Sequence, residues 1–197
     1  MAISERLKTF LDAQNISYKS QKHTVVYTAQ EIAAAQHVPG RQLAKCVLVT
    51  TNAGVALAVL PATFRVEFGK LKALLGAKRL SLASEADIKQ AFPDVEVGAM
   101  SVFGNLYGVP VIVEQSLTES AEIVCNAGTH SETITVSFRD FERSAHPKVG
   151  AFGMVPPGQK PKAARRRAAG TKKKTAKTSA RKTAARKPAK RTPRRKR

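Results

Sequence analysis

The chain has 197 residues, enough for one ordinary domain followed by a tail. Its formal charge of +20 at pH 7 is typical of a polyanion-binding protein, but this charge is unevenly placed. Residues 160–197 hold 19 of the 34 Lys and Arg residues and no Asp or Glu, which leaves 15 basic against 14 acidic residues before them. The N-terminal residues contain no apolar signal core, and no run approaches the ~18 apolar residues of a membrane span, so we expect a cytoplasmic protein without a membrane partner.

The two cysteines, Cys46 and Cys125, each lie in an apolar run without a second Cys or a His at ligand spacing. This context favours reduced, buried thiols over a zinc site or a disulfide framework, although a bridge between the two is left open. Neither a dinucleotide-binding fingerprint nor a lysine-containing phosphate loop occurs in the sequence. We therefore expect no cofactor and no metal.

In the N-terminal half, apolar spacing and capping residues predict short elements. Ser4 is expected to begin a helix that ends at Asn15, and a capping box at Thr28 to open a helix over residues 32–37. Strands are expected at residues 16–18 and 25–27. The runs 42–50 and 55–60, separated by a short turn at Asn52-Ala53-Gly54, are expected to form an antiparallel hairpin.

In the second half, apolar residues at helical spacing predict a helix over residues 68–75, ended by Gly76. Further elements are a strand at 79–82, a helix capped by Ser84 and running to Phe92, a strand at 109–114, a hairpin of 122–125 with 133–137, and a short helix from Asp140 to Arg143. This order of short elements predicts an α/β (α+β) fold, a compact mixed sheet with short flanking helices.

Lys45 lies in the apolar strand 42–50 and shares one face of it with Val47 and Val49. An unpaired buried ammonium costs several kcal/mol of desolvation, so the fold must offer Lys45 water, an anion or a cleft. The plainer interpretation is a lysine at a strand end whose stem lies on apolar surface while its head reaches solvent.

Two glycine-containing segments stand out later in the chain. Gly98 and Gly104 enclose small residues, which lets the backbone approach another group closely, although an irregular loop explains the same spacing. The turn Gly128-Thr129-His130 follows a strand, and its His130 is either a polar group at the rim of a cleft or an ordinary exposed turn residue.

From about residue 156 the composition changes abruptly to Lys, Arg, Ala, Thr and Pro. Such a segment cannot bury enough apolar surface to offset its conformational entropy, so we expect a disordered tail over residues 156–197. Its charge favours sequence-independent, salt-dependent binding to nucleic-acid phosphates. The candidate nucleic-acid-binding residues are Arg165, Arg166, Arg167, Lys172, Lys173 and Lys174.

Taken together, the Lys45 strand, the 98–104 loop and the 127–130 turn resemble the YbaK-like domain, also called the prolyl-tRNA synthetase-associated editing domain. The resemblance covers roughly residues 3–146 and implies a YbaK-like fold in residues 1–155. It implies a deacylase that hydrolyses the ester between a wrong amino acid and the terminal adenosine of tRNA. Lys45 and His130 are the implied catalytic residues, and the implied substrate-binding residues are Gly98, Ala99, Met100, Ser101, Gly104, Gly128 and Thr129.

One departure from the family is that this loop runs Met100-Ser101-Val102-Phe103, where many relatives have a proline. The departure leaves the choice among small amino acids, namely alanine, serine, threonine and cysteine, open. The implied partner is a mischarged tRNA, with the ribosome or another nucleic acid as a further partner of the tail. The alternative hypothesis is a non-catalytic nucleoid- or ribosome-associated protein that keeps the editing fold.

Overall fold

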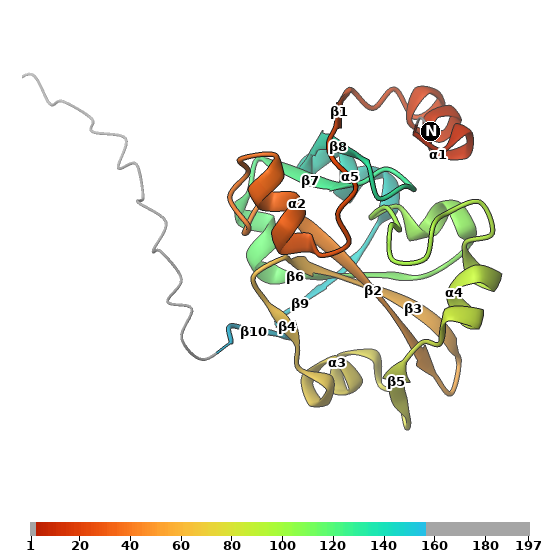
Figure 1. Cartoon of the computed structure of the whole chain (residues 1–197). Helices are drawn as coiled ribbons and strands as arrows, with labels where there is room; N and C mark the ends of the chain where they lie inside the picture. Colours follow the sequence, from red (N-terminus) through yellow and green to blue (C-terminus); the bar gives the residue numbers. More distant parts are fainter. Residues whose placement is uncertain (1–2, 157–197) are drawn as a thin grey trace, which may run out of the picture. The chain divides into compact units, whose positions relative to one another are not determined.

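Two β-sheets form the centre of the part of the chain that the computed structural model describes, residues 3–156 (Figure 1). The larger sheet has five strands in the order β5-β2-β3-β6-β9, with bounds Leu80–Leu82, Ala44–Thr51, Gly54–Pro61, Val111–Glu114 and Lys148–Gly150. The smaller sheet has the order β1-β8-β7, with bounds Tyr18–Lys22, Glu132–Ser137 and Glu122–Asn126. A separate pair joins β4 (Arg65–Val66) to β10 (Gly153–Met154).

Short helices connect and flank these strands. They are α1 (Glu5–Ala13), α2 (Ala29–Ala35), α3 (Phe68–Leu75), α4 (Glu85–Ala91) and α5 (Phe138–Ala145), with single 3-10 turns at Gly104–Tyr107 and Gln115–Glu119. The predicted α/β fold with a mixed sheet and short flanking helices is confirmed.

The β2–β3 hairpin is the longest pairing of the central sheet and contains Lys45, which lies opposite Leu60. Its tight turn ends at Gly54, whose φ of +120° is one that residues with a side chain rarely adopt. The predicted antiparallel hairpin is therefore confirmed. On its other side β3 pairs in parallel with β6, and β6 in parallel with β9.

The two faces of β2 are buried in two different apolar clusters. Leu48 belongs to the larger cluster, which also includes residues of α1 and α5, and Cys46 packs against it. Val49 belongs to a smaller cluster with Leu71 of α3, and Val47 packs against that one. The predicted alternation is thus present, and each fully buried Val or Leu contributes about 1.5–3 kcal/mol by leaving water.

Three local predictions were wrong. Residues 25–27 form no strand, and Tyr27 is 74% exposed. The first strand begins at Tyr18 and runs on to Lys22, because the polar residues 19–22 pair with β8, a partner distant in sequence. The last helix begins after Ser137, whose Oγ accepts a hydrogen bond from the Asp140 amide at 3.0 Å.

Candidate functional site

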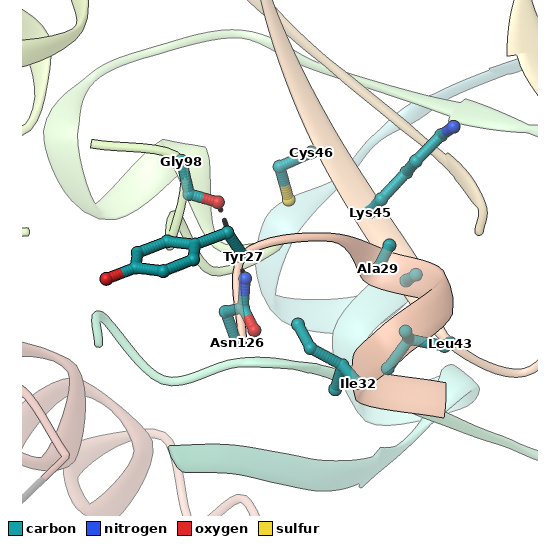
Figure 2. Close-up of a pocket in the computed structure, with 9 residues that line it drawn as sticks. Tyr27, Ala29, Ile32, Leu43, Lys45, Cys46, Gly98 and Asn126 are labelled. Carbon is teal, nitrogen blue, oxygen red and sulfur yellow. Dashed lines mark hydrogen bonds between the residues drawn. The ribbon is translucent and has the colours of Figure 1, made fainter. Parts of the chain in front are cut away.

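A cavity of about 160 Å³ lies where the start of β2 meets α2 and the segments around Gly98 and Asn126 (Figure 2). Its lining consists of Tyr27, Ala29, Ile32, Leu43, Ala44, Lys45, Cys46, Gly98 and Asn126. Two residues that the sequence analysis singled out, Lys45 and Gly98, therefore lie at one cavity although they are far apart in the chain.

The start of α2 is fixed by the predicted capping box. Thr28 Oγ1 accepts a hydrogen bond from the Glu31 amide at 3.3 Å, and the Glu31 carboxylate accepts one from the Thr28 amide at 3.0 Å. Because both neighbours of Thr28, Tyr27 and Ala29, line the cavity, this local motif holds one wall of it.

Lys45 is half-buried, and no carboxylate of residues 3–156 lies within ion-pair distance of it. Its Nζ donates a long hydrogen bond of 3.5 Å to the carbonyl of Ala62. Burial lowers the pKa of the Lys45 ammonium, and the nearby positive charge of Arg65 lowers this pKa further. In Figure 2 the side chain extends away from Tyr27 and Gly98. The site thus contains a cation whose charge no carboxylate of this region neutralises.

The two predicted glycine segments meet beside the cavity. The Gly128 amide donates to the Ala99 carbonyl at 3.2 Å, and the His130 amide donates to the Glu96 carboxylate at 2.7 Å. Asn126 adds a third link, because its Nδ2 donates to the Gly98 carbonyl at 3.4 Å (Figure 2). Long-range hydrogen bonds therefore hold the 127–130 turn against the 96–99 loop.

His130 lies behind the cavity wall and does not line the cavity. Its Nε2 is 2.9 Å from the Val97 carbonyl and so carries a proton in this contact, because a carbonyl only accepts. Its Nδ1 is buried and has no partner among the described residues. The ring packs on Tyr27, with ring centroids 4.8 Å apart, and a Cβ added to Gly98 would lie 3.5 Å from His130 Cε1.

The remaining residues of the 98–104 loop lie in the interior. Ala99, Met100 and Ser101 are buried, and the Ser101 carbonyl accepts a hydrogen bond from Cys46 Sγ at 3.3 Å. Gly104 is buried too, and a Cβ there would lie 3.0 Å from Leu57. Only Gly98 of this loop lines the cavity, so the other residues position the loop from behind.

Gly128 and Thr129 are buried in the second turn. Gly128 has a φ of +101°, and a Cβ there would lie 3.1 Å from Ser4 Cβ. Thr129 Oγ1 has no partner among the described residues. The six candidate nucleic-acid-binding residues of the tail, from Arg165 to Lys174, lie outside the described residues.

Three residues at the site were missed by the sequence analysis. Tyr27 and Asn126 line the cavity, and Arg65 is close enough to lower the pKa of Lys45. Tyr27 carried a local signal, since it directly precedes Thr28, whose capping box fixes the start of α2. Asn126 carried none, because the bridge of Leu43 with Val124 that brings it to the site joins segments distant in sequence. Arg65 carried none, because it lies beyond the end of the predicted hairpin.

Both cysteines are free thiols, as the sequence predicted. Burial raises the pKa of Cys46 well above its usual value, and it raises the pKa of Cys125 to about 12. Cys46 thus lines the cavity as a neutral thiol with little nucleophilic thiolate. Within residues 3–156, no group of three or more His, Cys, Asp or Glu side chains is placed to hold a metal ion, and no helix is long and apolar enough to span a membrane.

The fold is shared with solved structures of low sequence identity. One is described as "a putative trans-editing enzyme for prolyl tRNA synthetase"; it is 17% identical, has a TM-score of 0.71, and the alignment covers 78% of this chain and 98% of that one. A hypothetical protein is 19% identical with a TM-score of 0.70, over 76% of this chain and 100% of that one. A signal-transduction protein from Marinobacter aquaeolei, described as "putative", is 14% identical with a TM-score of 0.59, over 76% of this chain and 30% of that one.

These solved structures share the α/β fold of this chain, whereas the family is shown by its sequence. The family model of the aminoacyl-tRNA editing domain matches residues 23–144, more than half of the chain. The chain therefore belongs to the aminoacyl-tRNA editing domain family. A search of curated proteins gave no match.

Proposed function

We propose that the protein is an aminoacyl-tRNA deacylase that removes a small, wrongly attached amino acid from the 3′ end of tRNA in trans. The observation that carries this proposal is Lys45, a residue that lines the cavity and whose ammonium has no carboxylate partner among residues 3–156, in the part of the chain that matches the editing-domain family. The fold shared with a structure described as a trans-editing enzyme supports the same activity.

The reaction is hydrolysis of an ester that is already activated. Water attacks the ester carbonyl, a tetrahedral oxyanion forms, and the ribose oxygen leaves with a proton, so the enzyme mainly positions the water and stabilises negative charge. Lys45 supplies a positive charge for the substrate at the cavity. When the His130 ring is neutral with its proton on Nε2, its unpartnered Nδ1 is a hydrogen-bond acceptor. From its position behind Gly98 and Tyr27, this atom can orient a hydrogen-bond donor.

The size of the cavity favours a small aminoacyl group. Its volume of about 160 Å³ is close to that of an apolar protein cavity that binds one benzene molecule. A cavity of this size accommodates the side chains of alanine, serine, threonine and cysteine, the small residues that the second sieve of an editing system takes. Ala29 and Ile32 form part of its apolar wall.

The test is hydrolysis of a panel of mischarged tRNAs by the full chain and by Lys45→Ala at fixed low salt. We expect one small aminoacyl ester to be cleared quickly and the substitution to lower kcat/KM by about 10²–10³, the usual loss on removing a group that stabilises the oxyanion. Lys89→Ala, which removes an exposed lysine of α4, is the matched control and should keep full activity.

The second candidate function is nucleic-acid binding without hydrolysis. The direction of Lys45 favours it, because the ammonium already donates to the Ala62 carbonyl and points away from Gly98 and Tyr27 (Figure 2). The same assay separates the two candidates. Survival of every ester, together with unchanged RNA binding by Lys45→Ala, would leave the binding function and exclude the deacylase.

A further inference from the structure

We propose that a second surface, remote from the cavity, binds the backbone phosphates of the base-paired stem of tRNA. This inference rests on the proposed function and adds a contact for the body of the substrate. The surface, named here the basic face, lies around the exposed part of α3, on the residues just before β5 and at the start of β9. It consists of Lys70, Lys72, Lys78, Arg79 and Lys148.

The basic face holds five of the 15 Lys and Arg residues of a domain whose total charge is nearly neutral. All five of its side chains are exposed. Of these five, only Lys70 has a carboxylate of the described residues within ion-pair distance, Glu67 at 4.0 Å. Lys148 belongs to the same surface although it is distant in sequence, because its Nζ donates to the Leu74 carbonyl at the end of α3 at 2.6 Å. Unneutralised exposed cations on one surface predict a polyanionic partner.

A groove at one end of the basic face has the chemistry of a phosphate site. Its volume is about 580 Å³, and it is lined by Thr50, Thr51, Asn52, Lys78, Arg79 and Ser81, which include two cations, three hydroxyls and no carboxylate. Thr50 Oγ1 is buried and has no partner among the described residues. The Thr51 hydroxyl already donates to the Gly54 carbonyl at 2.9 Å, so a phosphate would accept hydrogen bonds from Lys78, Arg79 and Ser81, donors that an apolar or cationic partner cannot pair with.

Hydrogen bonds between the Asn52 side chain and two backbone amides fix the shape of the groove. Asn52, in the turn between β2 and β3, accepts hydrogen bonds through Oδ1 from the amides of Lys78 and Arg79 at 2.8 Å and 3.5 Å. The two cations therefore start from a fixed backbone position, which reduces the entropy lost when they bind a ligand. Figure 1 shows that this turn and β5 lie together at one end of the sheet.

The groove and the cavity are joined by a single strand. Lys45 at the start of β2 and Thr50 near its end are five residues apart, which corresponds to roughly 17 Å in an extended strand. Because side chains alternate along a strand, Lys45 and Thr50 lie on opposite faces of β2, and a single-stranded 3′ end of a few nucleotides is long enough to span this distance around the edge of the sheet. A tRNA whose 3′ end enters the cavity can thus place phosphates of the adjoining stem on the basic face.

The experiment compares the full chain with the double variant Lys78→Gln/Arg79→Gln by fluorescence-anisotropy titration of uncharged tRNA at several salt concentrations. The matched control is Lys8→Gln/Lys19→Gln, which removes the same charge from exposed positions on α1 and β1. We expect the basic-face variant to bind tRNA about 10-fold more weakly, with a slope of log K against log salt that is smaller by about 1–2, and the control to stay within about twofold.

Two further probes define the partner. A single-stranded oligonucleotide ending in CCA lacks the stem, so its affinity should be the same for the wild-type chain and the variant. Polyglutamate tests for a general anion site, and an equal loss of affinity for polyglutamate and tRNA would overturn the assignment to RNA. Equal tRNA affinity and salt slope for the variant and the control would overturn it as well. Because uncharged tRNA is the probe, these results are independent of whether the protein hydrolyses any ester.

Discussion

The surroundings of Lys45 disfavour the charged ammonium form of its side chain. Burial beside the cavity and the proximity of Arg65 both lower its pKa, and its only hydrogen-bond acceptor in the described residues is the Ala62 carbonyl at 3.5 Å. A cation with so little compensation interacts strongly with any anion that enters the cavity. An oxyanion that forms during ester hydrolysis would therefore gain more from Lys45 than from a fully solvated lysine.

We predict that deacylation by the protein falls on the alkaline side at a lower pH than an ordinary lysine would allow. A lysine keeps its proton below its pKa and loses it above, so a lowered pKa moves the loss of the ammonium to lower pH. Arg65→Gln removes the second cause of the lowering, so the alkaline limb of kcat/KM should move to higher pH, with activity at neutral pH unchanged within about twofold.

The measurement is the pH profile of kcat/KM, corrected for spontaneous ester hydrolysis at each pH. Arg139→Gln, which removes an exposed arginine from α5, is the matched control and should leave the limb in place. A limb that stays fixed in Arg65→Gln would show that the titrating group is not Lys45.

Tyr27 is exposed over 74% of its surface yet lines the cavity and packs on His130. We predict that Tyr27→Ala raises KM for mischarged tRNA by about 10-fold, because an exposed aromatic ring at the cavity can stack on a base, and stacking contributes about 1–3 kcal/mol per base. The free energy of unfolding should change by less than about 0.5 kcal/mol, since removing an exposed side chain creates no cavity in the core.

Tyr27→Phe separates the ring from the hydroxyl. In Figure 2 the hydroxyl points away from Gly98 and Asn126, so the phenylalanine variant should keep the wild-type KM. Loss of activity in Tyr27→Phe equal to that in Tyr27→Ala would contradict the stacking role. The readouts are steady-state deacylation kinetics and urea unfolding of both variants.

The candidate site could be predicted only in part from the sequence, for a physical reason. Lys45 was identifiable because an ammonium in an apolar strand is unusual on its own. His130 was identified from its turn, but its contacts with Tyr27 and Val97 depend on how β8 and the 96–99 loop pack together. Asn126 gave no local signal, because its position at the site follows from contact between distant segments, and Arg65 gave none because it lies beyond the end of the predicted hairpin.

Among the elements, those encoded by neighbouring residues were the ones that the sequence predicted well. The capping boxes at Thr28 and Ser84 and the hairpin of β2 with β3 each depend on residues within a few positions of one another. The polar strand β1 was placed too early, because its residues become a strand only through pairing with β8. The parallel neighbours β6 and β9 could not be inferred either, since a parallel pairing involves segments distant in sequence.

The 127–130 turn depends on one glycine, which gives a test at the scale of an element. We predict that Gly128→Ala lowers the free energy of unfolding by about 2–4 kcal/mol, since its φ of +101° is strained for alanine and the new Cβ would lie 3.1 Å from Ser4 Cβ. Gly76→Ala is the matched control, because Gly76 has a φ of +64° and open space around its Cβ position. Gly76→Ala should lower the free energy of unfolding by only about 1–2 kcal/mol, the cost of placing alanine in a left-handed backbone conformation.

Urea unfolding of both variants measures the difference. If Gly76→Ala and Gly128→Ala cost the same, the contact with Ser4 contributes nothing and the N-terminal segment relaxes freely. Because the same turn holds His130 through Glu96, Gly128→Ala should also lower deacylation in protein that is still folded.

For the whole molecule, the uneven distribution of charge suggests two separate contributions to RNA affinity. The first 159 residues are nearly neutral in total and place five of their 15 cations on the basic face, whereas residues 160–197 hold 19 Lys and Arg residues and no Asp or Glu. A uniform polycation binds phosphates without reading sequence or shape, and a fixed surface binds where its geometry matches. The tail would then raise the local concentration of any RNA, and the basic face would orient the stem relative to the cavity.

We predict that deleting residues 160–197 raises the apparent KM for mischarged tRNA and flattens its salt dependence, with little loss of kcat at saturating substrate. The reason is that each phosphate contact adds roughly 0.9 to the slope of log K against log salt, so removing a polycation removes most of that slope while the cavity and Lys45 stay unchanged.

The basic-face variant Lys78→Gln/Arg79→Gln should lower the remaining slope further in the shortened chain, because its contacts are independent of the tail. Steady-state kinetics at low and high salt on the four combinations of tail and basic face measure both effects. Kinetics that the deletion leaves unchanged at both salt concentrations would show that the tail has a partner other than the substrate.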